Sequence, residues 1–199
     1  MPRYKIDRRD IVRDQEAKEL VDGLIDPRDR AMVCFFYIFG CRPSELIKIK
    51  PDDFEVKDGK VYVTISTAKK RKGKSPITDP VRQLWWPADD YFMKILMDYV
   101  NLCDFGTPIW QYGGNAKSAS VIMNRRIKAV NPNICLYVFR HSRNGQFDEA
   151  GATNSHFVYW NGWADERPRK NYRHITKQIV DSMPVKAVNF DEPQKQDGQ

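Results

Sequence analysis

The feature that most constrains the fold is an apolar run, Met32–Phe39, which is followed directly by Gly40. A helix of this composition has to be buried in a core, and a glycine directly after it is typical of a C-terminal cap. We therefore expect a core helix from about Arg28 to Phe39, separated from the preceding segment by Pro27. The rest of the chain must supply the elements that cover it.

Shorter helical patterns lie on both sides of this run. Residues 10–22 form a polar helical pattern, and Pro43 suits the first position of another helix. Glu45 would then lie in the first turn, where the helix dipole favours a carboxylate, so Arg42 sits at or just before the N-terminus. Further helices are expected at about 91–100, 115–130, 140–151 and 155–160.

The periodicity changes from helical to strand-like after Asp53. Asp58-Gly59 is a strong signal for a type I′ hairpin turn, and apolar residues alternate on both sides of it, at positions 54, 56, 61, 63 and 65. A third strand is expected at Ser75–Thr78, after the lysine-rich turn 69–74. The chain is therefore predicted to be mainly α with a small three-stranded antiparallel sheet, an α+β arrangement.

Length and charge indicate one domain with nucleic acid as a candidate partner. The chain has 199 residues, enough for a single domain, and we assign residues 1–183 to it and the polar segment 184–199 to a disordered tail. It carries 33 Lys and Arg residues against 26 Asp and Glu, a formal net charge of +7. Charge alone is weak evidence, because many basic proteins never bind nucleic acid.

The cysteine and histidine patterns argue against a metal centre. None of the three histidines pairs with another ligand residue at a recognised spacing, and the four cysteines form no C-x-x-C pair. Free cysteines fit the reducing cytoplasm, and no secretion signal opens the chain. No apolar run reaches the roughly 20 residues needed to cross a bilayer. The sequence therefore predicts a cytoplasmic protein that binds neither metal nor membrane.

Five short motifs follow one another along the chain. They are Gly40-Cys41-Arg42-Pro43-Ser44-Glu45, the lysine-rich turn, Phe139-Arg140-His141-Ser142, Asn161-Gly162-Trp163 and Tyr172. In this order and spacing they resemble the catalytic domain of the tyrosine recombinase (phage integrase) family over about residues 10–180. The resemblance implies that catalytic-domain fold, and a site-specific recombinase or integrase that cleaves and rejoins DNA through a 3′-phosphotyrosyl intermediate. It implies no metal ion, ATP or other cofactor.

The resemblance also implies a role for each motif residue. Arg42 and Arg140 would bind the scissile phosphate, because a guanidinium stays charged and can hold two phosphate oxygens at once. Tyr172 would attack the phosphorus, and Trp163 would donate a hydrogen bond to a phosphate oxygen. A plainer interpretation of Arg42 is a surface residue paired with Glu45. Trp163 could likewise be a core residue, and Tyr172 an exposed tyrosine on a segment that contacts DNA.

The family's catalytic lysine, which protonates the leaving 5′-oxygen, corresponds to one of several lysines in the turn. Val61, Val63 and Ile65 share the apolar face of a strand, and continuing by twos reaches Lys69. A bulge at the turn would shift the pattern by one residue and favour Lys70 instead. We expect Lys69 to be the acid.

One position departs from the family pattern. The family usually places histidine three residues before the second arginine, and this chain has Tyr137 there. A phenol has a reference pKa of about 10, so it cannot act as a base near neutral pH. We expect Tyr137 either to support the phosphate through its hydroxyl or to be a core aromatic residue. His141, next to Arg140, is expected to be a structural helix residue.

The resemblance extends to partners and leaves two other functions open. Family members act on paired sites as tetramers, so this chain would form a homo-oligomer on double-stranded DNA and be a monomer in solution. Members usually carry a further helical DNA-binding domain before the catalytic one, for which we expect no room in this chain. The resemblance suggests a mobile genetic element such as a virus or plasmid, and the sequence does not distinguish these from a chromosomal gene. The alternatives are a type IB topoisomerase-like enzyme, which relaxes DNA, and a DNA-binding relative whose site has decayed.

Overall fold

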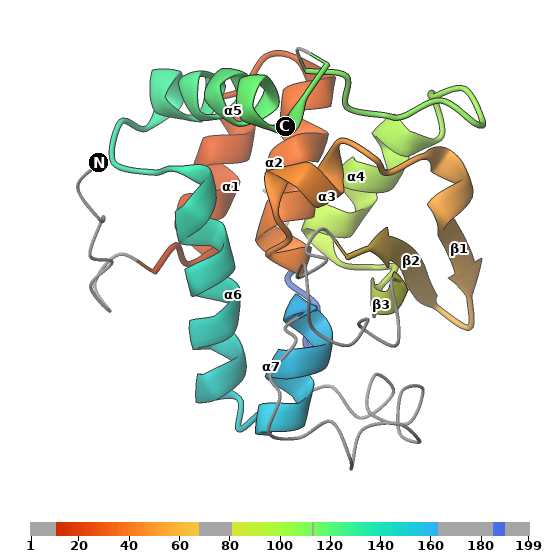
Figure 1. The fold of residues 1–199 in the computed structure, drawn as a ribbon. Helices are drawn as coiled ribbons and strands as arrows, with labels where there is room; N and C mark the ends of the chain where they lie inside the picture. Colours follow the sequence, from red (N-terminus) through yellow and green to blue (C-terminus); the bar gives the residue numbers. More distant parts are fainter. Residues whose placement is uncertain (1–10, 68–80, 113, 163–184, 190–199) are drawn as a thin grey trace, which may run out of the picture.

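The computed structural model describes residues 11–67, 81–112, 114–162 and 185–189. In these ranges the chain is mainly helical, with a small antiparallel sheet at one side (Figure 1). The elements are α1 (Asp14–Asp22), α2 (Pro27–Phe39), α3 (Pro43–Leu46), a 3-10 turn (Pro51–Asp53), β1 (Phe54–Lys57), β2 (Lys60–Ser66), β3 (Val81–Pro87), α4 (Tyr91–Val100), α5 (Ala116–Val130), α6 (Leu136–Glu149) and α7 (Asn154–Asn161). None of the helices in this part of the chain has the length and apolar composition needed to cross a membrane.

Helix α2 is the centre of the core, as the apolar run predicts. The carboxylate of Asp26 accepts a hydrogen bond from the Arg28 amide (2.9 Å), and Gly40 ends the helix in the left-handed conformation (φ 56°). Every residue from 31 to 39 is buried. Helices α1, α4, α5 and α6 pack around α2 and keep its apolar surface away from water (Figure 1). The predicted core helix and its glycine cap are confirmed.

The hairpin β1-β2 is also confirmed. Asp58 and Gly59 both have positive φ (51° and 71°), as a type I′ turn requires, and the two strands pair antiparallel on either side of them. The alternating residues of β2 are buried against the core: Val61, Val63 and Ile65. The face predicted from the period of two is therefore the face that meets the helices.

The third strand lies later in the chain than expected. It is β3, which pairs antiparallel with β2 to give the order β1-β2-β3, whereas the predicted segment Ser75–Thr78 lies outside the described residues. Leu84, Trp85 and Trp86 are consecutive in β3 and all buried. The charged Arg82 is buried and Val81 is exposed, so apolar and polar residues do not alternate as in an ordinary half-buried strand, and this segment gave no strand signal.

Helix α6 begins at Leu136, earlier than the predicted start near Arg140. The side-chain oxygen of Asn124, on α5, accepts a hydrogen bond from the Leu136 amide (3.0 Å). A cap donated by another helix satisfies one of the free amides of the first turn, and local sequence does not reveal it. As a consequence, Tyr137 and Arg140 lie about one turn apart on the same helix.

Helix α1 begins at Asp14, not at residue 10 as predicted. The Val12 amide donates to the hydroxyl of Ser142 on α6 (2.8 Å) and is therefore committed to a contact outside its own helix. The extended residues 11–13 thus tie the start of α1 to α6.

Part of the segment expected to form a disordered tail is fixed to the core. The Val188 amide donates to the buried Asp90 carboxylate (2.6 Å), and the Val188 carbonyl accepts from the Tyr91 amide (2.7 Å). The same carboxylate caps the N-terminus of α4 through the amides of Phe92 and Met93. Residues 185–189 therefore belong to the folded unit.

Candidate active site

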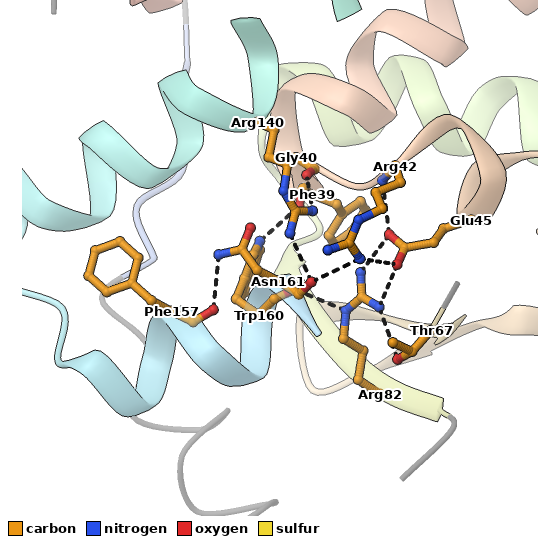
Figure 2. A network of polar contacts seen from close by, with 10 residues as sticks. All are labelled: Phe39, Gly40, Arg42, Glu45, Thr67, Arg82, Arg140, Phe157, Trp160 and Asn161. Carbon is orange, nitrogen blue, oxygen red and sulfur yellow. Dashed lines mark hydrogen bonds and ion pairs between the residues drawn. The ribbon is translucent and has the colours of Figure 1, made fainter. Parts of the chain in front are cut away.

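The two motif arginines come from distant parts of the chain and meet at one backbone carbonyl. Arg42 is the N-cap residue of α3, and Arg140 lies on α6. Nη2 of Arg140 and Nη1 of Arg42 both donate to the carbonyl of Asn161, at 2.9 and 3.5 Å (Figure 2). The end of α7 therefore holds two guanidinium groups next to each other.

Arg140 points inward, as expected from the apolar residues that precede it. Its side chain is buried, and Nη1 donates to the carbonyl of Gly40 (3.0 Å). Burial and the positive charge of Arg42 lower the pKa of Arg140 to about 10, so the group still carries its charge at neutral pH. A buried cation held by carbonyl dipoles is oriented before any ligand arrives.

Arg42 makes the local contact that the plainer interpretation of its position expects. Its Nη1 and its backbone amide donate to the two carboxylate oxygens of Glu45, at 3.0 and 2.9 Å, which is the expected local pair. Its side chain nevertheless remains 26% exposed beside the buried Arg140. Glu45 thus fixes Arg42, whose side chain stays partly accessible to solvent.

Arg82 is a third arginine of this network, and the sequence did not predict it (Figure 2). It lies on β3 and is only 3% exposed. Nη2 donates to Glu45 (3.0 Å), Nε to the carbonyl of Trp160 (2.9 Å), and Nη1 to the hydroxyl of Thr67 (3.3 Å). The sequence holds one signal for this residue: Arg82 lies two positions before the apolar Leu84, and residues two apart in a strand share a face. The signal can be used only once this segment is known to be a strand.

The end of α7 is fixed by its own side chains. The indole N–H of Trp160, which is fully buried, donates to the carbonyl of Phe39 (2.9 Å). The amide of Asn161 donates to Asn144 Oδ1 (2.7 Å), and Gly162 ends the helix in the left-handed conformation (φ 57°). The predicted closure of α7 at Asn161-Gly162 is confirmed, and it aims the Asn161 carbonyl at the arginines.

A cleft of about 1020 Å³ opens over the two arginines. The α3 turn, α5 and α6 contribute its walls, and its basic lining residues are Arg42, Lys117, Arg125, Lys128 and Arg140. A concave surface lined by cations attracts polyanions, because low-dielectric walls concentrate the field. The cleft is therefore suited to a phosphate-bearing ligand.

Tyr137 lies in the wall of this cleft and not in the core. It is 60% exposed, and its ring makes an edge contact with His141, with 4.6 Å between ring centroids. The interpretation of Tyr137 as a core aromatic residue is therefore wrong. His141 also lines the cleft, in addition to its place on α6.

Four of the residues singled out in the sequence lie outside the described residues: Lys69, Lys70, Trp163 and Tyr172. The last described residues before their two segments are Thr67 and Gly162, and both lie against Arg82. A Cβ atom at Gly162 would come within 2.9 Å of Arg82 Nη1, so this position has no room for a side chain. The described chain therefore stops beside the arginine network at both points.

Comparison with solved structures identifies the fold. XerH site-specific recombinase bound to difH substrate, in a pre-cleavage complex, matches with a TM-score of 0.58 over 87% of this chain and 52% of that chain, at 15% identity. XerA recombinase matches with a TM-score of 0.58 over 92% of this chain and 65% of that chain, at 18% identity. The chain has the tyrosine recombinase fold.

The likeness to recombinases confirms the predicted fold class and is one of structure only. A second XerH complex, post-cleavage with palindromic difH substrate, matches with a TM-score of 0.56 at 16% identity, over 86% of this chain and 51% of that chain. No protein-family model and no curated protein matches the sequence. The chain spans between about half and two thirds of the length of these recombinases.

Proposed function

We propose that this chain is the catalytic part of a site-specific recombinase or integrase that cleaves and rejoins DNA through a covalent tyrosine link. The observation that carries the proposal is the meeting of Arg42 and Arg140 at the carbonyl of Asn161, at the floor of a basic cleft. Two guanidinium groups fixed side by side can hold a phosphate by several oxygens. The likeness in fold to XerH bound to difH substrate supports the same function.

In the proposed reaction, the hydroxyl of Tyr172 attacks the phosphorus held by the two arginines. A bond forms between the tyrosine oxygen and phosphorus, and the bond from phosphorus to the 5′-oxygen breaks, which leaves a 3′-phosphotyrosine and a free 5′-hydroxyl. Negative charge builds on the non-bridging oxygens in the transition state, where Arg42 and Arg140 stabilise it. A 5′-hydroxyl from another strand reverses the step and joins the new strand, so no metal or ATP is required.

Proton transfer in this reaction rests on few groups. Lys69, or Lys70 if the turn contains a bulge, gives a proton to the leaving 5′-oxygen. Tyr172 gives its proton to solvent water as it attacks, and the arginine charges favour the phenolate. Trp163 and Tyr137 donate hydrogen bonds to phosphate oxygens, and neither acts as a base at neutral pH.

The proposed substrate is double-stranded DNA, and the proposed assembly is a tetramer on two paired sites. Three further cations line the cleft: Lys117, Arg125 and Lys128. Side chains of this kind bind successive backbone phosphates and release counterions, so their contribution weakens as salt is added. They add affinity without reading sequence.

Trapping of the covalent intermediate tests the proposed function. The substrate is a pool of nicked duplexes of randomised sequence, in which cleavage beside the nick frees a short oligonucleotide and prevents religation. We expect an adduct that survives SDS, with a free 5′-hydroxyl on the released strand, because the phosphotyrosine bond is covalent. Tyr172→Phe should form no adduct.

The matched control for this experiment is Tyr159→Phe. Tyr159 lies on α7, where its hydroxyl bonds the backbone of Gln83 (3.3 Å), so its loss should leave the adduct unchanged. Absence of an adduct from every duplex in the pool contradicts the proposal. Relaxation of supercoiled DNA by a protein that never joins two sites would favour the topoisomerase-like alternative.

The histidine in the cleft wall should report phosphate binding. Burial and the charge of Arg140 lower the pKa of His141, whereas burial alone lowers that of His156. A bound phosphate offsets the arginine charge, so we expect added inorganic phosphate to raise the pKa of His141 and leave that of His156 unchanged. Proton NMR titration of the imidazole resonances measures both, with His141→Gln for assignment. Equal responses of the two histidines would contradict a phosphate site beside Arg140.

A further inference from the structure

We propose that Arg82 is a positioning residue, which neutralises Glu45 and thereby leaves the charge of Arg42 available for phosphate. The inference rests on the proposed function, because it concerns the same phosphate site. Arg82 lies beneath the site and is almost inaccessible, so it acts through Glu45 and not by direct contact with a substrate.

The first observation is that Glu45 lies between two arginines. Its carboxylate is fully buried, and it accepts from Arg42 on one side and from Arg82 on the other, with Nη1 and Nη2 of Arg82 at 3.3 and 3.0 Å. Burial would raise the pKa of Glu45, but the charge and hydrogen bonds of Arg82, followed by those of Arg42, hold it below its usual value. The carboxylate is therefore ionised and shared.

The second observation concerns the charge balance of the network. Two guanidinium groups, those of Arg42 and Arg82, pair with one carboxylate, and a third, that of Arg140, is held nearby by the carbonyls of Gly40 and Asn161 (Figure 2). Without Arg82, more of the negative charge of Glu45 would fall on Arg42, and the site would lose much of the attraction of that arginine for an anion. Charges this close interact by several kcal/mol even at an effective dielectric constant of about 20, so the difference is large.

The third observation is that Arg82 is bound to the same turn as the two site arginines. Arg82 donates a hydrogen bond to the carbonyl of Trp160 (2.9 Å), while Arg42 and Arg140 donate to the carbonyl of the next residue, Asn161. Arg82 thus holds the peptide group directly before the one that the two site arginines bind. A buried ion pair is weak evidence for stability in itself, which makes an electrostatic role the better explanation of this one.

Phosphate affinity tests the inference without depending on DNA cleavage. Inorganic phosphate is titrated into the protein at low ionic strength, and binding is followed through the imidazole resonance of His141. We expect Arg82→Gln to weaken binding by about tenfold or more, because one positive charge near the site is lost. Arg82→Lys keeps the charge and should stay closer to the unsubstituted protein than Arg82→Gln does.

The double variant Arg82→Gln with Glu45→Gln separates charge from structure. It removes one positive and one negative charge, so we expect phosphate binding to recover to within about threefold of the unsubstituted protein. If Arg82 only holds the fold together, the double variant should bind no better than Arg82→Gln, and that result would overturn the inference. Unchanged phosphate binding in Arg82→Gln would also overturn it.

Two further arms cover a variant that does not fold and a failure of the proposed function. If Arg82→Gln does not fold, Glu45→Gln alone must strengthen phosphate binding, and unchanged or weaker binding contradicts the charge role. The same variants are assayed for the covalent DNA adduct. Suppose that phosphate binding is weakened in Arg82→Gln and recovers in the double variant, but that the unsubstituted protein forms no DNA adduct. That result would support the role of Arg82 and refute the recombinase function.

Discussion

Replacement of Arg140 by alanine should lower the rate of DNA strand cleavage by about 10²–10³, the usual cost of losing one preoriented donor to a transition-state oxyanion. The expected loss is large because Arg140 is oriented in advance by the carbonyls of Gly40 and Asn161. Arg42, the neighbouring arginine of the proposed phosphate site, is held in its own position by Glu45 and so does not replace Arg140. Single-turnover cleavage of a nicked duplex at saturating protein measures the rate without interference from weaker binding.

The control for this variant is Arg13→Ala. Arg13 is a surface arginine that pairs with Glu149 at the end of α6 (2.7 Å), and removal of an exposed pair of this kind usually has little effect. We expect an unchanged cleavage rate. A similar loss in both variants would mean that general charge, and not the position of Arg140, drives the reaction.

Replacement of Trp160 by alanine should lower the free energy of unfolding by about 3–5 kcal/mol, the usual range for a buried aromatic residue. Trp160 is fully buried, and its ring packs against Phe39, Trp86 and Phe147. It also directly precedes Asn161, so a shift of the α7 end would move the carbonyl that both site arginines share. Urea denaturation followed by far-ultraviolet circular dichroism measures the loss without relying on tryptophan fluorescence.

The matched variant Trp160→Phe keeps most of the ring packing but removes the indole N–H. The carbonyl of Phe39 then loses its partner, and we expect a smaller loss of about 1–3 kcal/mol. A loss below about 1 kcal/mol in the alanine variant would contradict the central packing role of this residue.

The elements that local sequence specifies were predictable. Helix α2 carries an apolar run between a proline and a glycine, and the β1-β2 hairpin carries alternation around Asp58-Gly59. The start of α6 was not, because it depends on a cap donated by Asn124 from another helix. Strand β3 was missed because it buries the charged Arg82, leaves Val81 exposed and buries Leu84, Trp85 and Trp86 in succession, so its apolar residues do not alternate.

The site residues also fall into those that the sequence could predict and those that it could not. Motif spacing identified Arg42 and Arg140, and the structure brings them to one carbonyl. The residues that position them, Arg82 above all, carry no motif, since their roles arise from contacts between segments that are distant in sequence. The exposure of Tyr137 likewise follows from where α6 begins, and the sequence left it undecided.

The most direct test of the central claim is to identify the amino acid that is joined to DNA in the trapped adduct. The adduct is digested with trypsin and nuclease, and the peptide that retains a nucleotide is sequenced by mass spectrometry. We predict a phosphodiester on Tyr172, absent from the Arg140→Ala protein at the same reaction time. A nucleotide on any other residue, Tyr137 or Tyr159 included, would contradict the claim that Tyr172 attacks a phosphate held by Arg42 and Arg140.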